Sequence, residues 1–171
     1  TVTEEIEEKK VEKTAEGVVL KEDPKYLAGA IQLNAEGKVE FVLDTQASGK
    51  SADEIYNIVF QYMSKLIKSE QNINSRIPLV NRNNKNEQII ACIMDEWFVF
   101  NQSFISLDRS ETKYQLVATI SDNHLRLSMT RIVFNYEEGR STGFKEPAEN
   151  VITDKYALTK KKNDLAKIYG K

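Results

Sequence analysis

The sequence predicts an α+β fold, in which one long helix packs on one face of a mostly antiparallel sheet of four to six strands and a further helical segment lies near the C-terminus. Three observations lead to this fold class. Residues 87–138 form an almost continuous β-pattern, a capped amphipathic segment precedes them, and a Lys-rich segment follows. At 171 residues the chain suits one core with an appendage. We therefore expect a flexible charged tether at 1–23 and a single domain at 24–171.

The tether is predicted from charge. Residues 1–16 are rich in Glu and Lys and carry too few large apolar side chains to offset the entropy of ordering. Its only expected regular structure is a short helix held by pairs such as Glu5 and Lys9. Pro24 then marks a loop, after which Val39, Phe41 and Leu43 alternate with other residues and are expected to share one face of a first strand.

A helix is predicted after Gly49. Ser51 and Glu54 have the spacing of a capping box, which stabilises a helix N-terminus by about 1 kcal/mol. Apolar residues follow at helical spacing and define the face expected to pack on the sheet: Ile55, Ile58, Val59, Tyr62, Met63, Leu66 and Ile67.

The strands that follow are predicted from alternation and turn residues. Ile77–Val80 forms a short strand that ends at the polar loop 81–86. The run 88–100 is apolar on both parities, so it is either a central strand covered on two faces or two strands broken at Asp95–Glu96. Residues 114–120 alternate and lead through a turn at 121–123 into a returning strand.

In the returning strand, the large apolar residues move from odd-numbered to even-numbered positions partway along. Leu125, Leu127 and Met129 share one face, but the larger residues then continue at Ile132, Phe134 and Tyr136. A bulge near Thr130–Arg131 would keep both groups in the core. The alternative is that the far end of the strand is covered on its opposite face. Beyond it, 148–158 and 160–169 carry apolar residues at roughly helical spacing.

Composition and motifs exclude several function classes. A formal net charge of −2 gives no field that would attract polyanions, so nucleic acid is not an expected partner. No apolar run is long enough to cross a bilayer, and because the given sequence opens on Thr1, we expect no signal peptide within it. Glycines are scattered over separate loops, so a phosphate-binding loop is not expected. We expect no cofactor.

Candidate catalytic residues are few. His124 is the sole histidine and follows a turn, where a solvent-boundary role is expected. Cys92 lies in an apolar strand, where a thiol behaves as a small buried hydrophobe, and it has no partner for an intrachain disulfide. Lys160–Lys162 is expected to be a solvated helix face. Among the carboxylates, Asp95 and Glu96 are adjacent and point to opposite faces, and Asp108 with Arg109 and Glu111 suggests a surface charge pattern.

Aromatic side chains on the sheet are the feature that points toward an activity. If one face is not covered by a helix, some of them are left exposed, and large exposed apolar patches usually bind a partner. The candidate interaction surface consists of Trp97, Phe98, Tyr114 and Tyr136.

Several segments resemble a family of Bacteroidetes proteins described as a domain of unknown function with a TBP-like fold. The resemblance covers about 39–158 and rests on Gly49–Ser51, Glu96–Phe100, Leu107–Arg109, Tyr114–Leu116 and Ile152–Leu158. It implies one helix over a curved antiparallel sheet and export to the periplasm, the outer membrane or the medium, because members usually begin with signal or lipoprotein sequences. It implies no catalytic residue.

Three function hypotheses follow. The first is a noncatalytic envelope or secreted protein whose sheet or helix edge binds another protein or an envelope component. The second is a carrier that holds a small apolar ligand between helix and sheet, suggested by the two-sided apolar run. The third is a hydrolase that uses Asp95, Glu96, Asp108 or Asp154 from separate strands.

Overall fold

The computed structural model describes residues 12–14, 17–19, 28–84, 86–102, 107–137 and 139–158. The chain divides into two compact units. The larger, the sheet unit, spans Leu33–Glu149, and the smaller, the terminal unit, combines Thr1–Gln32 with Asn150–Lys171. The division at residue 23 into a tether and a domain stays a prediction.

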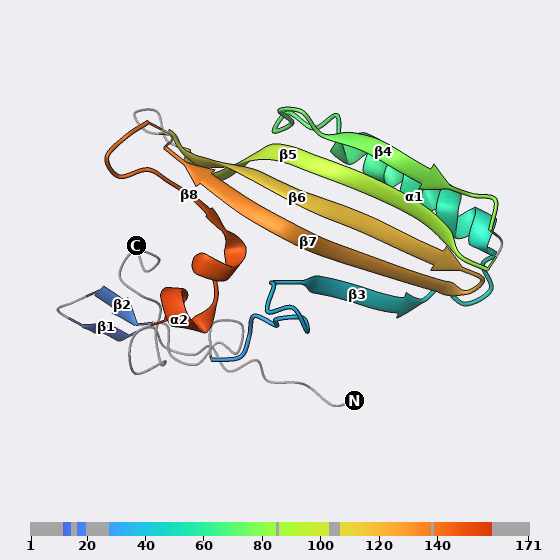
Figure 1. Ribbon diagram of the computed structural model, residues 1–171, viewed down its shortest axis with the longest axis horizontal. Helices are drawn as coiled ribbons and strands as arrows, with labels where there is room; N and C mark the ends of the chain where they lie inside the picture. The colour runs from blue at the N-terminus through green and yellow to red at the C-terminus, as the bar shows by residue number, and fades with distance from the viewer. Residues whose placement is uncertain are drawn as a thin grey trace. The chain divides into compact units, whose positions relative to one another are not determined.

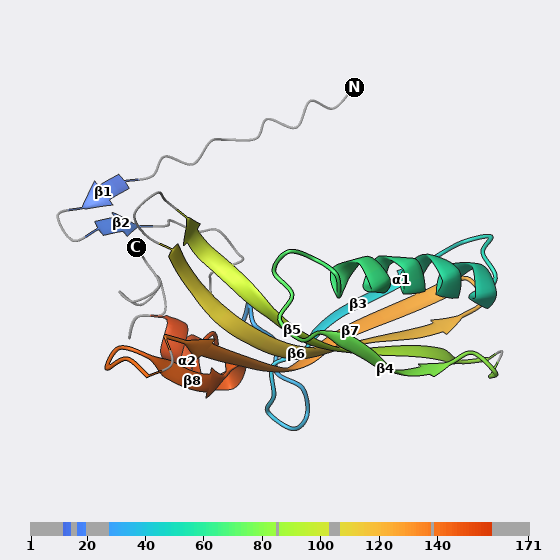
Figure 2. The same ribbon diagram turned by 90° about the horizontal axis from the view of Figure 1, so that it is seen from above.

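The sheet unit is built on a six-stranded antiparallel sheet (Figure 1). Five strands lie in the order β3-β7-β6-β5-β4, and β8 pairs with the far half of β7. Their bounds are β3 (Phe41–Gln46), β4 (Arg76–Asn81), β5 (Gln88–Gln102), β6 (Leu107–Ser121), β7 (His124–Tyr136) and β8 (Phe144–Pro147). Helix α1 (Ala52–Leu66) lies on one face of this sheet (Figure 2). The predicted α+β class is confirmed.

The apolar run in the middle of the chain forms one central strand. β5 continues through Asp95 and Glu96 and pairs with β4 on one side and β6 on the other. The alternative of two strands broken at this dipeptide is therefore wrong. Ile90, Cys92 and Met94 on one face of β5 are buried against α1, whereas Ile89 and Ile93 on the opposite face are half-buried. β5 is therefore covered on one face only, and over its first half.

The parity change in β7 is produced by a bulge, as predicted. Thr130 pairs with Gln115 and Val133 pairs with Lys113, so two residues of β7 lie opposite Tyr114. Arg131 has a φ of 53°, in the left-handed region, which accommodates the extra residue. The bulge keeps Ile132 on the same face as Met129, and Ile132 is 4% exposed.

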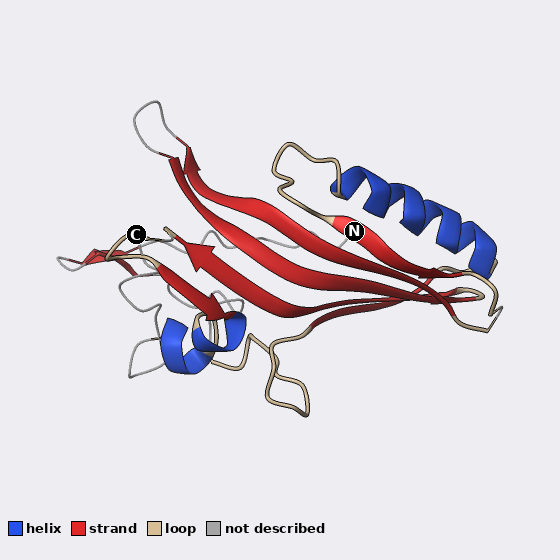
Figure 3. Ribbon diagram, turned by 45° about the horizontal axis from the view of Figure 1, so that its top comes forward, coloured by secondary structure: helices blue, strands red, loops and turns tan. Residues whose placement is uncertain are grey.

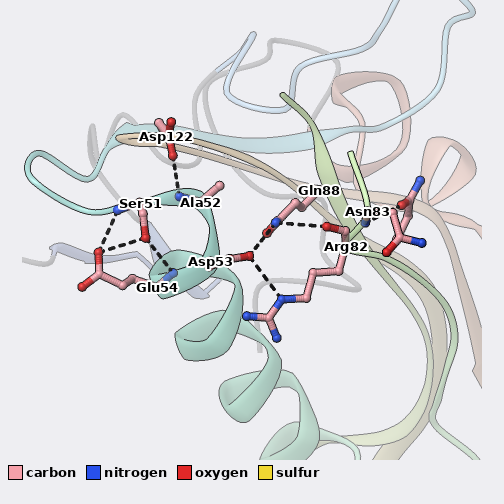
Figure 4. A network of polar contacts seen from close by, with 9 residues as sticks. Ser51, Ala52, Asp53, Glu54, Arg82, Asn83, Gln88 and Asp122 are labelled. Atoms are coloured by element: carbon pink, nitrogen blue, oxygen red, sulfur yellow. Dashed lines mark hydrogen bonds and ion pairs between the residues drawn. The ribbon is translucent and has the colours of Figure 1, made fainter. Parts of the chain in front are cut away.

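Helix α1 begins with the predicted capping box (Figure 4). The backbone N–H of Glu54 donates to Ser51 Oγ at 3.3 Å, and the backbone N–H of Ser51 donates to Glu54 Oε2 at 2.8 Å. The bonds from the Ser51 backbone and side chain lower the pKa of Glu54. In addition, Asp122 Oδ1 accepts the N–H of Ala52 at 2.8 Å. Two orphan donors of the first turn are thus bonded from two separate segments.

Replacing Ser51 with alanine is expected to lower the free energy of unfolding by about 1 kcal/mol, because one helix N–H loses its acceptor. Chemical denaturation of the wild type and the variant measures this cost. Ser51→Asp is the matched control, since aspartate also caps a helix and should retain most of the stability. Equal losses for both variants would contradict the role given to the Ser51 hydroxyl.

The core lies between α1 and the middle of the sheet. Its buried side chains are Ala52, Ile55, Tyr56, Val59, Met63, Ile90, Cys92, Met94, Ala118 and Ile120. Leu66 and Ile67 pack against this cluster, as predicted. The helix contacts β5 and β6, so it covers one half of its sheet face (Figure 3).

One prediction about the core is wrong. Ile58 and Tyr62 of α1 are exposed, because they lie on a flank of the helix that turns away from β5. In the first strand only Val39 is buried, whereas Phe41 and Leu43 are exposed. The reason is position: β3 lies at the edge of the sheet, beyond β7, and α1 packs over β5 and β6.

The turn between β6 and β7 is joined to the segment that leads into α1. Asn123, with a φ of 60°, accepts the N–H of Gly49 through its side chain and the N–H of Ala47 through its carbonyl oxygen. Its own N–H donates to the carbonyl oxygen of Lys50. A second set of polar contacts involves Asp53 in the first turn of α1. Asp53 Oδ1 accepts from the Gln88 side chain at 2.8 Å and from the Arg82 side chain at 3.2 Å (Figure 4). These bonds fix the N-terminal end of α1 on the sheet.

The terminal unit contains two short antiparallel strands, β1 (Glu12–Thr14) and β2 (Gly17–Val19), and a one-turn helix, α2 (Asp154–Ala157). Asp154 Oδ2 accepts the N–H of Gly29 at 2.9 Å. The predicted helical pattern at 148–158 forms a 3-10 turn, η2 (Ala148–Asn150), followed by α2. The predicted helix at 160–169, the Lys160–Lys162 triplet and the Glu5–Lys9 pair lie outside the described residues.

Candidate functional site

The four aromatic residues predicted as an interaction surface do not share one face of the sheet. Phe98 lies opposite Ser110, which lies opposite Tyr136, so these two aromatic residues belong to one cross-strand row. Tyr114 pairs with Met94 and lies on the same face. Trp97 precedes Phe98 in β5 and therefore points to the opposite face.

Their environments also differ. Phe98 is 54% exposed, and the ring of Tyr136 packs on that of Phe144 at 5.7 Å. Trp97 is half-buried with the guanidinium of Arg109 3.7 Å from its ring centroid. The hydroxyl of Tyr114 donates to Glu96 Oε1 at 2.6 Å, and burial together with this bond raises the pKa of Tyr114. The assignment of these residues to a binding surface stays a prediction.

A second apolar surface lies beside α1. It consists of Phe41 and Leu43 from β3 and Ile58 and Tyr62 from α1, which we call the β3–α1 surface. Phe41 is 41% exposed, and the other three side chains are between 54% and 60% exposed.

The strand register places the β3 residues on the face that carries the helix. Leu43 lies opposite Leu127 of β7, Leu127 opposite Ala118 of β6, and Ala118 opposite the core residue Ile90. Because α1 packs over β5 and β6, the half of this face formed by β7 and β3 is left open. Figure 1 shows α1 behind β4 and β5, with β3 at the other edge.

The helix residues lie on the flank of α1 that faces this open half. Tyr62 is close enough to Tyr114 of β6 to contribute to its raised pKa. On the other flank, Tyr56 lies under the guanidinium of Arg82, at the end of β4, with 4.8 Å between the guanidinium carbon and the ring centroid. Leu125 and Leu127 of β7 are half-buried against the core and lie between α1 and β3. The four exposed side chains therefore border a common apolar floor.

A polar cluster occupies the opposite face of the sheet. Lys113 Nζ lies 3.1 Å from Glu111 Oε1 and 3.7 Å from Asp95 Oδ2, and Asn135 donates to Glu111 Oε2 at 2.8 Å. Burial raises the pKa of Asp95, and neighbouring Glu111 raises it further against the attraction of Lys113. Burial acts in the same direction on Glu111, but bonds from Asn135 and Lys113 outweigh it and lower its pKa. The pKa values of Asp95 and Glu111 are thus shifted in opposite directions.

The acidic residues considered for hydrolysis do not form one cluster. Asp95 and Glu96 point to opposite faces of β5, and Asp154 bonds Gly29 in the terminal unit. The side chain of Asp108 lies outside the described residues. Within the described part of the chain, no three His, Cys, Asp or Glu side chains are placed to hold a metal ion. The expectation of no cofactor stays a prediction.

Cys92 and His124, the two single residues considered for catalysis, lie where the sequence predicted. Cys92 is 1% exposed in the core, and burial raises its pKa to about 11, so the thiol stays protonated at neutral pH. His124 lies at the solvent boundary next to the turn, with Nε2 2.6 Å from Asp44 Oδ1. None of the described helices is long and apolar enough to span a membrane.

The β3–α1 surface was not predicted, because Ile58 and Tyr62 were expected to pack on the sheet and the sequence does not show that β3 lies at its edge. The contact between Asp95 and Glu111 was also not predicted. The signal for that contact was present, since Glu111 and Lys113 share a parity in a strand with β-pattern, but it required the register of β5 on β6.

Known proteins agree with this architecture. The family model "Domain of unknown function (DUF4468) with TBP-like fold" matches residues 41–135, from the first residue of β3 to the last but one of β7. A crystal structure of a DUF4468 family protein from Bacteroides ovatus is similar, with 36% identity, a TM-score of 0.70, and coverage of 85% of this chain and 81% of that one.

A TBP-like protein from Parabacteroides distasonis shares the fold, with 24% identity, a TM-score of 0.54, and coverage of 71% of this chain and 72% of that one. No curated protein matches the sequence. The family match and the Bacteroides ovatus structure agree with the resemblance drawn from the sequence. The chain therefore belongs to the DUF4468 family of unknown function, whose fold is TBP-like.

Proposed function

We propose that this chain is a noncatalytic binding domain of the cell envelope, and that its β3–α1 surface binds a protein or another envelope component. The observation that carries the proposal is the exposure of Phe41, Leu43, Ile58 and Tyr62 around the apolar floor of β7. Exposed apolar patches of this kind usually mark interaction sites. The envelope location rests on the family resemblance.

The other two hypotheses have less support. The layer between α1 and the sheet, where a carried ligand would lie, is occupied by the side chains of the core. The acids considered for hydrolysis lie on different faces and in different units. Fold alone does not decide the function, so the binding proposal rests on the surface and not on the TBP-like architecture.

Photoreactive residues placed at Leu43 and Tyr62 in native cells are expected to cross-link the same partner, identified by mass spectrometry. Phe98 serves as a comparison, because it belongs to the other candidate surface. Capture from Phe98 but not from Leu43 or Tyr62 would transfer the binding role to the predicted aromatic residues. Capture from none of the three positions would contradict a binding domain.

Ile58→Lys is expected to reduce this cross-linking at least tenfold, because a charge would enter the apolar contact. Gln61→Lys is the matched control, since Gln61 is an exposed residue of the same helix and receives the same charge. Both variants should unfold within about 0.5 kcal/mol of the wild type, as exposed substitutions usually do. Equal loss of cross-linking in both variants would indicate a general charge effect and count against the surface.

A further inference from the structure

The two edges of the sheet differ in how they are protected against pairing with another strand. At the β4 edge, Pro78 removes a backbone donor, and the register with β5 shifts between Arg76 and Leu79. Prolines and bulges are the usual devices that prevent an edge strand from pairing further. At the β3 edge, Phe41–Gln46 pairs with β7 without a register shift and contains no proline or lysine. The β3 edge is therefore the unprotected one.

Among the described residues, no strand pairs with the outer edge of β3, and an isolated bridge joins Val39, just before β3, to Leu33. Along its helix-bearing face lie Phe41 and Leu43, which are apolar and exposed. On the opposite face, Glu40 accepts from Arg126 and Asp44 contacts His124, so both carboxylates lie beside Val42 on that face. The side chain of Asp44 is 56% exposed. The edge thus presents an apolar row on one face and an acidic row on the other.

We propose that the outer edge of β3 accepts an extended segment of a partner protein as an added strand, with apolar side chains over Phe41 and Leu43 and basic side chains beside Glu40 and Asp44. The inference rests on the proposed function and names the partner chemistry for the same surface. Backbone hydrogen bonds to the open edge supply affinity, and the alternating side chains supply specificity.

Charge complementarity favours such a segment over a second copy of this chain. In an antiparallel pair of two β3 strands, the register that places Phe41 against Leu43 places Val42 against Val42 and Glu40 against Asp44. Carboxylates directly opposite one another destabilise a strand pair. Lysine or arginine at those positions would instead form favourable pairs with both acids.

A nine-residue peptide, acetyl-Thr-Val-Lys-Val-Thr-Val-Lys-Val-Thr-amide, is a suitable probe because its pattern is the same in either chain direction. We expect it to bind the full chain at least tenfold more tightly than the version with glutamate in place of both lysines. On binding, alternate amides of β3 should exchange with solvent at least tenfold more slowly, since every second N–H points to the outer edge and would gain an acceptor. Nuclear magnetic resonance measures both quantities.

Asp44→Lys should reverse the preference, so that the glutamate peptide binds more tightly than the lysine peptide. Glu87→Lys is the matched control, because it changes net charge equally at an exposed residue outside β3 and should leave the preference unchanged. Binding of neither peptide, equal binding of both, or binding without alternate protection in β3 would overturn the inference. So would a concentration-dependent dimer that Asp44→Lys strengthens, because the edge would then accept a second copy, with the introduced lysine against Glu40.

These outcomes are distinct from failure of the proposed function. Cross-linking from Tyr62 that Ile58→Lys abolishes, together with no peptide binding, would retain the β3–α1 surface and reject strand addition. Absence of both results would reject the two proposals together.

Discussion

Replacing Ile90 with alanine is expected to lower the free energy of unfolding by about 2 to 5 kcal/mol. Ile90 is 0% exposed and lies opposite Ala118 in the middle of the sheet, where α1 covers it. Truncation loses the transfer free energy of three carbons and leaves a cavity that the small neighbour Ala118 cannot fill. Urea denaturation with extrapolation to water measures the change.

Ile58→Ala is the matched control, because it deletes the same atoms from a residue that is 54% exposed. Its cost should be within about 0.5 kcal/mol of zero, and alanine also has the higher helix propensity. A cost for Ile58→Ala close to that for Ile90→Ala would contradict the exposed position of Ile58. It would instead support the sequence-based prediction that Ile58 packs on the sheet.

Asp95→Asn is expected to raise the free energy of unfolding by about 1 to 3 kcal/mol at neutral pH, the usual cost of leaving a buried polar group poorly satisfied. Asp95 is 8% exposed, and its pKa is raised by burial and by Glu111. The amide of asparagine is uncharged at every pH, so its burial does not carry the cost of burying a charge. It can also donate a hydrogen bond to the Glu111 carboxylate. The loss of the 3.7 Å contact with Lys113 reduces the gain but does not reverse it, because Lys113 retains Glu111 at 3.1 Å.

The pH dependence gives the sign of this effect. A carboxyl whose pKa is raised in the folded state stabilises the fold below its unfolded pKa, about 3.9, and this contribution is lost as pH rises through the folded pKa. The advantage of Asp95→Asn should therefore be smallest below about pH 4 and grow as pH increases. Thermal unfolding of both proteins across this range measures it.

Glu111→Gln is the companion test in the same cluster. The pKa of Glu111 is lowered, so its carboxylate stabilises the fold above its unfolded pKa, and this contribution is lost as pH falls through the folded pKa. The substitution should destabilise the protein by about 1 to 2 kcal/mol at neutral pH, because the ion pair with Lys113 is lost. Changes of the same sign in Asp95→Asn and Glu111→Gln would contradict the opposite roles given to the two acids.

Elements that depend on local patterns were predicted well. The capping box of Ser51 and Glu54 needs only residues three apart, and the structure contains both of its hydrogen bonds. The bulge at Arg131 followed from a parity change within one strand, which local alternation reveals. The family was also recognisable from short segments, and the fold that it implied is present.

Features that depend on which strands are neighbours could not be predicted. Leu43 alternates like a core residue, but the sequence does not show that β3 lies at the edge, outside the cover of α1. Helical spacing likewise places Ile58 and Ile55 on one broad stripe, and only the position of α1 over β5 and β6 divides them. The placement of Asp95 close to Glu111 required the register of two strands, in which Asp95 pairs with Lys113 and Trp97 with Glu111.

The turn formed by Asp122 and Asn123 has a consequence for engineering the protein. Both side chains are exposed, and exposed hairpin tips are ordinarily the first choice for inserting an affinity tag or opening a new chain terminus. Here an insertion would separate the groups that bond Gly49, Lys50 and Ala52, 70 to 74 positions earlier in the chain. Accessibility is therefore a poor guide at this tip, and a fusion made there would loosen the start of the helix.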